Sequence, residues 1–294
     1  MGNNHTMMKI LIAALILIAI SVFLYWSNKS IVITRYKYES ADVPKQFDGF
    51  RIAQVSDLQS EYFGKDQANL IAKVRETKPD AIMITGDILD RNHTNYDAAW
   101  SAVSQLLKIA PVYYVNGNHE LALDEATMQD FYQRMRDAGV NVLMDEVAAI
   151  DKDGGTIYIA GLSEYVLYES RGDADSHSSE HDPQIIKSAV DDLTKDIDSS
   201  DFVVMLAHEP QFIDDYADSS IDLILSGHAH GGQIRLPFTQ GLYAPGQGTL
   251  PKLTSGMHKS GSTTMVISRG LGNSVFPFRI FNRPEVVEVT LEKK

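Results

Sequence analysis

The sequence predicts an α/β protein with a membrane-spanning segment near its N-terminus. From residue 50 onward, short apolar runs typical of buried strands alternate with stretches of helical periodicity. Five of the strand-like runs stop at carboxylate, amide or imidazole side chains. A nearly continuous apolar run also covers residues 10–26. Together, these three observations predict a folded α/β domain that is attached to a membrane and carries a polar site at one edge of a sheet.

Bulk composition limits the classes of function. The chain has 294 residues, 44% of them hydrophobic, which is enough for a substantial core in one large domain or two small ones. Acidic residues outnumber basic ones by 39 to 26, and the net charge of −13 argues against nucleic acid as a partner. Cysteine is absent, so a metal site has to use His, Asp, Glu or Asn instead of thiolates.

The apolar run at residues 10–26 is interpreted as an uncleaved signal-anchor. Its 17 residues are the lower limit for crossing a bilayer, and Tyr25 and Trp26 close it with side chains favoured at the interface. A cleavable signal peptide is the alternative, but the run ends in bulky residues and no small-residue cleavage site follows. We therefore expect a tail at 1–9, a single-pass anchor at 10–26, a linker and first strand at 27–45, and one folded domain at 46–294.

Charges beside the anchor carry a weak orientation signal. Lys9 precedes the apolar run, whereas Lys29, Arg35 and Lys37 follow it. By the positive-inside rule, this asymmetry points to a cytoplasmic domain. The family resemblance described below favours the opposite side of the membrane.

Periodicity and turn residues predict the elements of the domain. In residues 65–77, Ala68, Ile71 and Val74 lie on one helical stripe, and Pro79 ends the helix before the next apolar run. The same criteria predict helices at 65–77, 98–109, 127–138 and 183–197. Strands are predicted at 31–38, 50–55, 81–85, 112–115, 140–143, 156–162, 202–207, 222–225, 263–268 and 286–291.

Two segments are predicted to be loops. Residues 163–183 are polar and acidic, and they are interpreted as a surface loop. His177 and His181 have the spacing of a helical metal pair, but Gly172 and Pro183 leave little room for a helix, so solvated side chains are favoured. Residues 236–251 are rich in Gly and Pro and are expected to cover the polar site as a long loop.

Polar side chains directly follow five of the predicted strands. In open α/β sheets, ligands bind outside the carboxyl ends of the strands, so we expect these side chains to converge although they are far apart in the sequence. They are Asp57, Asp87, Asn118 with His119, His208, and His228 with His230. His228 and His230 are two residues apart, so an extended backbone would point both side chains to one pocket.

This set of side chains predicts a site for two metal ions. Oxygen and imidazole ligands without sulfur suit Mn, Fe, Zn or Mg. Six or seven such ligands are too many for one ion and are appropriate for two. A two-metal site lowers the pKa of bound water, so that hydroxide forms at neutral pH, and it clamps the attacking and leaving oxygens of a phosphoryl displacement.

The motifs resemble, in order, those of the calcineurin-like metallophosphoesterases. They are Asp-Leu-Gln at 57–59, Gly-Asp-Ile-Leu-Asp at 86–90, Gly-Asn-His-Glu at 117–120, His208, and Gly-His-Ala-His at 227–230. The resemblance covers about residues 50–291. Residues 231–272 resemble the bacterial membrane-associated phosphodiesterase branch, whose members are typically anchored or exported. We therefore expect a single-pass protein of the cell membrane whose catalytic domain lies outside the cytoplasm.

The resemblance implies a fold and a role for each matching residue. The fold would be a four-layer αββα sandwich of two mixed sheets with helices outside. Asp57 and His230 would hold the first ion and Asp87 would bridge both ions. The second ion would be held by Asn118, His208 and His228. His119 would protonate the leaving oxygen or stabilise developing charge, with Asp90 orienting it. The simpler interpretation of Asp90 is an ordinary turn carboxylate.

Gln59 departs from the family pattern, which has histidine at this position. The amide oxygen is a weaker and harder ligand than imidazole, so the first site would bind more loosely, prefer Mn or Mg over Zn, or use water instead. The Asp-x-Gln pattern resembles the manganese-dependent ADP-ribose and CDP-alcohol diphosphatase branch, and Mn is the favoured ion. The same departure leaves open a member that binds metal or a phosphorylated ligand without turnover.

The expected activity is hydrolysis of a phosphodiester or pyrophosphate bond by metal-bound hydroxide. The anchor suggests a lipid or cell-envelope substrate, and a nucleotide diphosphatase is the alternative. Arg269 or Arg279 is predicted to contact a second phosphate, with support of the structure as the alternative role. The enzyme is expected to be a monomer. A metallo-β-lactamase-like fold is rejected because Gly232 and Gln233 replace the Asp and His of its motif.

Overall fold

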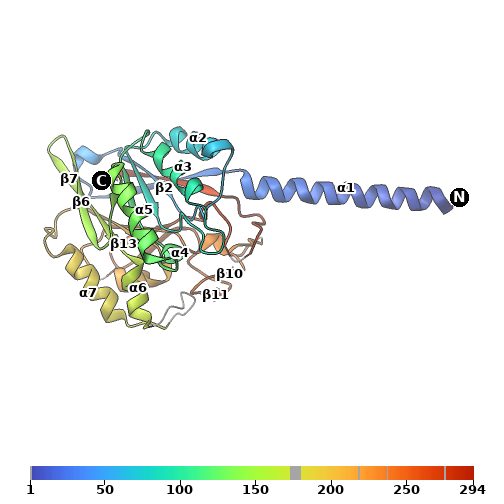
Figure 1. The fold of residues 1–294 in the computed structure, drawn as a ribbon. Coiled ribbons are helices and arrows are strands. Elements are labelled where there is room, and N and C mark those ends of the chain that lie inside the picture. Colours follow the sequence, from blue (N-terminus) through green and yellow to red (C-terminus); the bar gives the residue numbers. More distant parts are fainter. Residues whose placement is uncertain (1, 173–179, 218, 237, 275) are drawn as a thin grey trace.

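Two six-stranded β-sheets form the centre of the computed structural model, which describes residues 2–172, 180–217, 219–236, 238–274 and 276–294. Helices cover the outer faces of both sheets (Figure 1). A long helix, α1 (Gly2–Lys29), projects from this body on the side away from the C-terminus (Figure 1). The α/β prediction and the four-layer arrangement implied by the resemblance are both confirmed.

The first sheet carries the N-terminal half of the domain and the last strand of the chain. Its strand order is β1 (Val32–Ser40), β14 (Glu285–Lys293), β2 (Arg51–Val55), β3 (Ala81–Thr85), β4 (Val112–Val115) and β5 (Asn141–Val142). Strands β2 to β5 are parallel, so their carboxyl ends meet at one edge. Strand β14 runs antiparallel to β2 and parallel to β1.

The second sheet is built from later parts of the chain. Its strand order is β12 (Gly256–Ser260), β13 (Thr263–Ile267), β9 (Leu223–Ser226), β8 (Val203–Ala207), β7 (Gly155–Leu162) and β6 (Glu146–Lys152). The four inner strands are parallel and the two edge strands are antiparallel to their neighbours. The edge strands β6 and β12 were not predicted: β12 has no apolar run, and the apolar run of β6 covers only residues 147–150.

Alternating side chains on buried strands separate the layers. In β2, Ile52 points into the core between the sheets, whereas Ala53 and Val55 point toward the helices outside. The helices over the first sheet are α2 (Ala68–Thr77), α3 (Tyr96–Leu106) and α5 (Glu125–Asp137). Those over the second sheet are α6 (Glu164–Arg171), α7 (Pro183–Thr194) and α8 (Ile213–Tyr216). Burial on both faces explains why the central strands are almost wholly apolar.

The prediction of a surface loop at residues 163–183 is wrong for its first part. Residues Glu164–Arg171 form helix α6, in which Leu167 is buried against the second sheet. His177 lies outside the described residues. His181 is partly buried: its Nε2 atom lies 2.8 Å from Asp215 Oδ2 and its ring packs edge-on against Phe212. The predicted solvated histidine is therefore wrong for His181.

The long loop predicted at residues 236–251 contains a small sheet. Strands β10 (Tyr243–Ala244) and β11 (Gly248–Thr249) pair as an antiparallel hairpin. Each strand has only two residues, which is too short for a periodicity of two to be recognised. Pro245 and Gly246 occupy the turn between them.

Helix α1 is longer than the apolar run predicted to be the anchor. Its segment His5–Lys29 has 25 residues, and the most apolar 18-residue window in it has a mean hydropathy of 2.7 and no buried share. By length and composition it can cross a membrane, although a signal sequence near the N-terminus has the same properties. The following strand, β1, lies at the edge of the first sheet and pairs with β14 along its whole length.

The core between the two sheets can be tested at Leu206, which is fully buried there. We expect Leu206→Ala to lower the free energy of unfolding by about 2–5 kcal/mol, because the cavity adds to the lost apolar burial. Val147→Ala on the exposed face of β6 is the control and should cost less than about 1 kcal/mol. Urea denaturation followed by circular dichroism measures both, and equal losses would contradict the assigned core.

Candidate metal centre

The carboxyl ends of strands from both sheets meet at one edge of the sandwich. Asp57 and Asp87 follow β2 and β3, and Asn118 and His119 follow β4 in the short helix α4 (Asn118–Leu121). From the second sheet, His208 follows β8, and His228 and His230 follow β9. All seven side chains are buried, with relative exposures of 7% or less. The structure thus brings together the predicted strand-end residues.

These side chains form two groups with a common member. The ligand atoms of Asp87, His208 and His228 lie within 4.8 Å of one another, and so do those of Asp57, Asp87 and His230. Asn118 joins the first group, since its Oδ1 atom lies 2.9 Å from His228 Nδ1. Asp87 belongs to both groups, which is the geometry of a carboxylate between two ions.

Hydrogen bonds fix which imidazole nitrogens face the site. His208 Nδ1 lies 2.7 Å from the Thr85 carbonyl oxygen, which can only accept, so Nδ1 carries the proton. His208 Nε2 is therefore the nitrogen that faces the site, and it lies 3.3 Å from Asp87 Oδ2. His230 Nδ1 similarly faces the Gly272 carbonyl oxygen, and its Nε2 lies 3.4 Å from Asp57 Oδ1.

Buried atoms without partners show that the residues fit metal ions. Among the described residues, His208 Nε2, His228 Nε2 and Gln59 Oε1 are buried and have no hydrogen-bond partner. Unsatisfied buried acceptors are costly, and a bound cation would satisfy them. The donor set of carboxylate, amide and imidazole, without sulfur, suits divalent ions of the Mn, Fe, Zn or Mg type.

Electrostatics at the site also favour cations. Burial lowers the pKa of His228 and of His230 to about 4, so both imidazoles are neutral at pH 7 and free to act as ligands. Burial alone would raise the pKa of Asp87, but His208 and His119 lower it below its usual value. The buried Asp87 carboxylate is therefore ionised and stabilised by positive charge from the site.

Several site residues have a strained backbone. Asp57, Asp87, His228 and His230 have φ values of 52°, 52°, 64° and 45°, in a region that non-glycine residues rarely adopt. Carboxylate oxygens hold the adjoining segments in place, since Asp57 accepts the His228 amide and Asp87 accepts the His119 amide, both at 2.9 Å. Strain of this kind persists only where surrounding contacts determine the conformation, and it clusters at functional sites.

Two glycines permit the strands to approach the carboxylates. A Cβ atom at Gly117 would lie 2.2 Å from Asp87 Oδ1, and one at Gly227 would lie 1.9 Å from Ser56 Oγ. Neither distance is compatible with a side chain, so glycine is required next to Asn118 and His228.

Glu120 organises the backbone around Asp87, a role that the sequence did not indicate. It accepts the amide hydrogens of Asp87, Leu89 and Gly117, each at 2.8 Å. Burial and the neighbouring Asp87 raise the pKa of Glu120 to about 7. The only sequence signal was its place in the Gly-Asn-His-Glu motif at 117–120.

His119 and Asp90 lie together beside the two groups. His119 Nδ1 is 3.4 Å from Asp90 Oδ1, and His119 Nε2 is 3.9 Å from Asp87 Oδ2. Burial would lower the pKa of His119, but Asp87 and Asp90 raise it above its usual value. His119 lines a narrow pocket over the site together with Arg91. Arg91 was not predicted because it lies six residues after the end of β3, whereas the predicted residues lie closer to the ends of their strands.

Gln59 contacts the site through its amide nitrogen. Gln59 Nε2 donates to Asp87 Oδ2 at 2.8 Å, whereas Gln59 Oε1 has no partner among the described residues. The residue also has a left-handed backbone, with φ of 51°. At the position where the family pattern has a histidine, this chain therefore has an amide that donates a hydrogen bond to the Asp87 carboxylate.

The two arginines predicted to contact substrate are engaged within the protein. Arg269 Nε and Nη2 donate to Glu285 Oε2 at 2.9 and 2.6 Å. Arg279 is 1% exposed, donates from Nε to the Gly272 carbonyl oxygen at 3.2 Å, and has Nη2 3.4 Å from His230 Nδ1. Neither residue lines the pocket that contains His119.

A buried ion-pair network lies next to His208 and was missed in the sequence. Arg171 on α6 pairs with Glu209 at 2.9 Å and with Glu164 at 3.1 Å, and all three side chains are almost fully buried. Glu209 directly follows His208, so the network supports the segment that carries this histidine. The polar composition of residues 163–183 concealed it, since charged residues are rarely buried unless paired.

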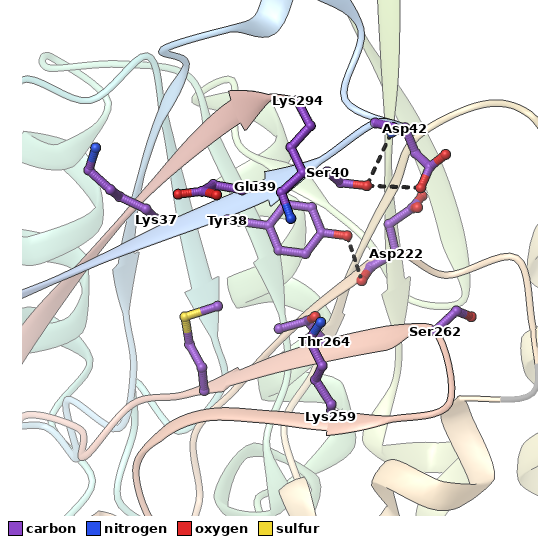
Figure 2. Close-up of a pocket in the computed structure, with 12 residues that line it drawn as sticks. Lys37, Tyr38, Glu39, Ser40, Asp42, Asp222, Lys259, Ser262, Thr264 and Lys294 are labelled. Atoms are coloured by element: carbon purple, nitrogen blue, oxygen red, sulfur yellow. Dashed lines mark hydrogen bonds between the residues drawn. The ribbon is translucent and has the colours of Figure 1, made fainter.

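A larger pocket of about 480 Å³ lies at the opposite edge of the sheets, where β1 and β14 end (Figure 2). Lysines 37, 259 and 294 surround it, and the Tyr38 hydroxyl donates to the Asp222 carbonyl oxygen at 3.3 Å (Figure 2). Burial raises the pKa of the Asp222 carboxyl to about 6. None of the predicted site residues lines this pocket, so it is separate from the metal centre.

Comparisons with known proteins identify the family. The family model for calcineurin-like phosphoesterases matches residues 50–232, which include every strand-end residue of the site. The chain belongs to this family. It is 31% identical to the uncharacterized metallophosphoesterase YkuE of Bacillus subtilis, over 91% of this chain and 88% of that protein. It is 26% identical to phosphodiesterase YaeI of Escherichia coli, over 82% of each protein.

Solved structures share the fold. Sulfate thiohydrolase SoxB of Thermus thermophilus superimposes with a TM-score of 0.50, over 77% of this chain and 52% of that chain, at 14% identity. At this identity the likeness concerns the fold alone. The family uses a dimetal centre, and the two Asp and His groups of this chain can hold one.

Metal content tests the shared position of Asp87. We expect the wild-type chain to bind two divalent ions, and Asp87→Asn to bind one or none, because the amide removes a negative charge from both groups. Asp222→Asn, at the opposite edge of the sheets, is the control and should retain both ions. Inductively coupled plasma mass spectrometry after dialysis against Mn measures the stoichiometry. Two ions in Asp87→Asn would contradict the arrangement.

Proposed function

We propose that the chain is a membrane-anchored phosphohydrolase with two metal ions that cleaves phosphodiester or pyrophosphate bonds in a lipid or cell-envelope substrate. The observation that supports it most is Asp87, a buried carboxylate common to two groups of ligands. Family membership supports phosphoester hydrolysis, and the similarity to the phosphodiesterase YaeI supports a diester. Gln59 in place of histidine favours Mn, a harder ion than Zn.

The residues around Asp87 have separate tasks in this proposal. Asp57 and His230 would hold one ion, Asn118, His208 and His228 would hold the other, and Asp87 would contribute to both. When bound, the ion pair supplies hydroxide at neutral pH and neutralises charge on the phosphoryl oxygens. Glu120 and Gln59 keep the Asp87 carboxylate in position through its backbone amide and its Oδ2 atom.

His119 is the proposed proton donor to the leaving oxygen. Asp87 and Asp90 raise the pKa of His119 above its usual value, which favours the protonated ring, and its Nε2 atom lies on the Asp87 side of the ring. Asp90 holds the opposite nitrogen and so orients the ring toward the pocket. Arg91 lines the same pocket and is available to bind phosphoryl oxygens.

The anchor gives the proposed location. Helix α1 would cross the cell membrane once and hold the catalytic domain at its outer surface, in agreement with the anchored or exported branch that residues 231–272 resemble. We also propose that the chain acts as a monomer. The net charge of −13 argues against nucleic acid as substrate.

A nucleotide diphosphatase is the second candidate. The Asp-Leu-Gln motif at 57–59 favours it through its resemblance to the ADP-ribose diphosphatase branch. Since Arg269 and Arg279 are paired within the protein, Arg91 is the arginine placed to contact a second phosphate. A chain that binds metal without turnover is the remaining alternative that Gln59 leaves open.

Activity on a model diester tests the proposed reaction. We expect the purified chain, loaded with Mn, to hydrolyse bis-p-nitrophenyl phosphate, and both chelation and Asp87→Asn to abolish the activity. Zn, Fe and Mg, together with nucleotide diphosphates and phosphomonoesters, complete the panel. An inert protein with two ions bound would exclude the enzyme, and a strong preference for phosphomonoesters would contradict the substrate class.

His119→Ala separates proton transfer from metal binding. We expect kcat for bis-p-nitrophenyl phosphate to fall by about 10²- to 10⁴-fold, because a general acid is lost, while the chain still binds two ions. Asp90→Asn should cause a smaller loss, since it only disturbs the orientation of the ring. His258→Ala on β12 is the control. Loss of an ion in His119→Ala would show that His119 is a ligand instead.

A further inference from the structure

The last turn of α1 is attached to one segment of the domain, residues 279–283. Ser27 Oγ donates to the Arg279 carbonyl oxygen at 2.7 Å, and the Arg279 amide donates to Asn28 Oδ1 at 2.8 Å. The Arg283 guanidinium lies 4.6 Å from the centre of the Trp26 ring and donates from Nε to the Ser30 carbonyl oxygen at 2.9 Å. These contacts fix the direction in which α1 leaves the domain.

The same segment contacts the metal centre. Asn282 Nδ2 donates to the backbone carbonyl oxygens of His230 and Gln233, at 2.7 and 3.1 Å. Arg279 lies against His230 on the other side. The metal centre is therefore close to the end of the helix that enters the membrane.

Phe281 lies at the depth of the apolar part of α1. Its ring centroid is 5.4 Å from that of Phe23, which lies three residues before the end of the apolar run at Trp26. With a rise of 1.5 Å per residue, Phe23 lies roughly 4.5 Å deeper along the helix than Trp26. Phe281 is nevertheless 64% exposed to water in the absence of a bilayer.

Further exposed apolar side chains lie on the same segment as Phe281 and on the segment bonded to it. Phe276 and Phe278 are 40% and 43% exposed and pack against each other with ring centroids 6.2 Å apart. Leu236 and Phe238 are exposed on the adjacent segment, which is joined to this one by the Arg235 amide and the Ile280 carbonyl oxygen at 3.0 Å. We call Leu236, Phe238, Phe276, Phe278 and Phe281 the aromatic face. Exposed apolar surface of this kind marks a binding surface.

A pocket of about 370 Å³ links the base of α1 to the metal centre. Lys29, the last residue of α1, lines one part of it, and Gln59, Asp90 and Ser274 line another. Gln59 contacts Asp87, Asp90 contacts His119, and Ser274 also lines the narrow pocket over the metal centre. The pocket therefore lies between the base of α1 and side chains that contact the metal centre.

We propose that the aromatic face inserts into the bilayer that α1 spans, and that the pocket opens at the membrane surface to receive a phosphorylated lipid whose chains stay in the bilayer. The inference rests on the proposed membrane anchoring and specifies the substrate class. Lys29, which lies three residues beyond the apolar run and pairs with Glu61, and Arg283, whose guanidinium lies over the Trp26 ring, are both near the expected level of the lipid phosphates. Phe281 at the level of Phe23 identifies the bilayer, and not a protein, as the occupant.

Single-cysteine labelling of the full chain tests the insertion, because the chain has no native cysteine. Nitroxide labels are placed at Phe276→Cys and Phe278→Cys in vesicles of phosphatidylcholine and phosphatidylglycerol. Leu15→Cys in α1 marks the bilayer, and Val147→Cys on β6, at the far end of the domain, marks water (Figure 1). We expect oxygen to relax labels 276 and 278 as strongly as it relaxes label 15. A water-soluble nickel complex should relax label 147 but not labels 276 and 278. Water-exposed labels 276 and 278 overturn the proposal, and a water-exposed label 15 overturns the anchoring as well.

A second experiment compares two diesters with the same leaving group. The variant Phe276→Ser, Phe278→Ser, Phe281→Ser should lower kcat/KM for hexadecyl p-nitrophenyl phosphate in vesicles by about tenfold or more, since apolar contact with the bilayer is lost. Activity on soluble methyl p-nitrophenyl phosphate should stay within about twofold, as should both activities of Val147→Ser. Equal losses on both diesters, or none on the hexadecyl diester, overturn the proposal. An inactive wild type on both would refute the proposed hydrolysis, whereas the labelling result would still decide the insertion.

Discussion

The negative charge of Asp87 in a fully buried position is the constraint on which the candidate site depends. Such a charge requires nearby positive charge and donors, and the structure supplies donors from several directions: Gln59 from the β2 end and His119 from the β4 end. The neutral imidazoles of His228 and His230 supply lone pairs but no positive charge. Two bound cations would complete this arrangement, which explains why the residues gather there at the expense of local backbone strain.

Topology brings the ligands together, and short-range geometry selects the residues. Parallel strands in both sheets place their carboxyl ends at one edge, so each strand needs to contribute only one or two polar residues. Glycine at 117 and 227 then lets neighbouring loops approach within contact of the carboxylates. The helices outside contribute little to the chemistry, but they bury the outer faces and hold the strand ends in register.

The sequence predicted the fold class and the convergence of the strand-end residues because both follow from local patterns. An apolar run followed by Asp87 or His208 shows where a buried strand ends, and parallel strands make those ends meet. The partner of each charge does not follow from such patterns. Arg171 and Glu164 have the composition of surface residues and are buried only because α6 packs on its sheet. The hydrogen bond from Gln59 Nε2 to Asp87 likewise depends on contacts between distant segments. Edge strands β6 and β12 were not predicted because backbone hydrogen bonds to β7 and β13, and not apolar burial, define them.

The pairing of β14 between β1 and β2 has a consequence for folding. Val32 is in register with Glu285, so the first sheet cannot close until nearly the whole chain has been synthesised. Loop closure over such a separation is slow compared with the formation of local helices. Strand β1 would thus remain unpaired after α1 and β1 have been synthesised. The apolar surface between β1 and β2 would stay exposed until β14 pairs with both strands. Pairing of β14 therefore completes the sheet that carries Asp57 and Asp87.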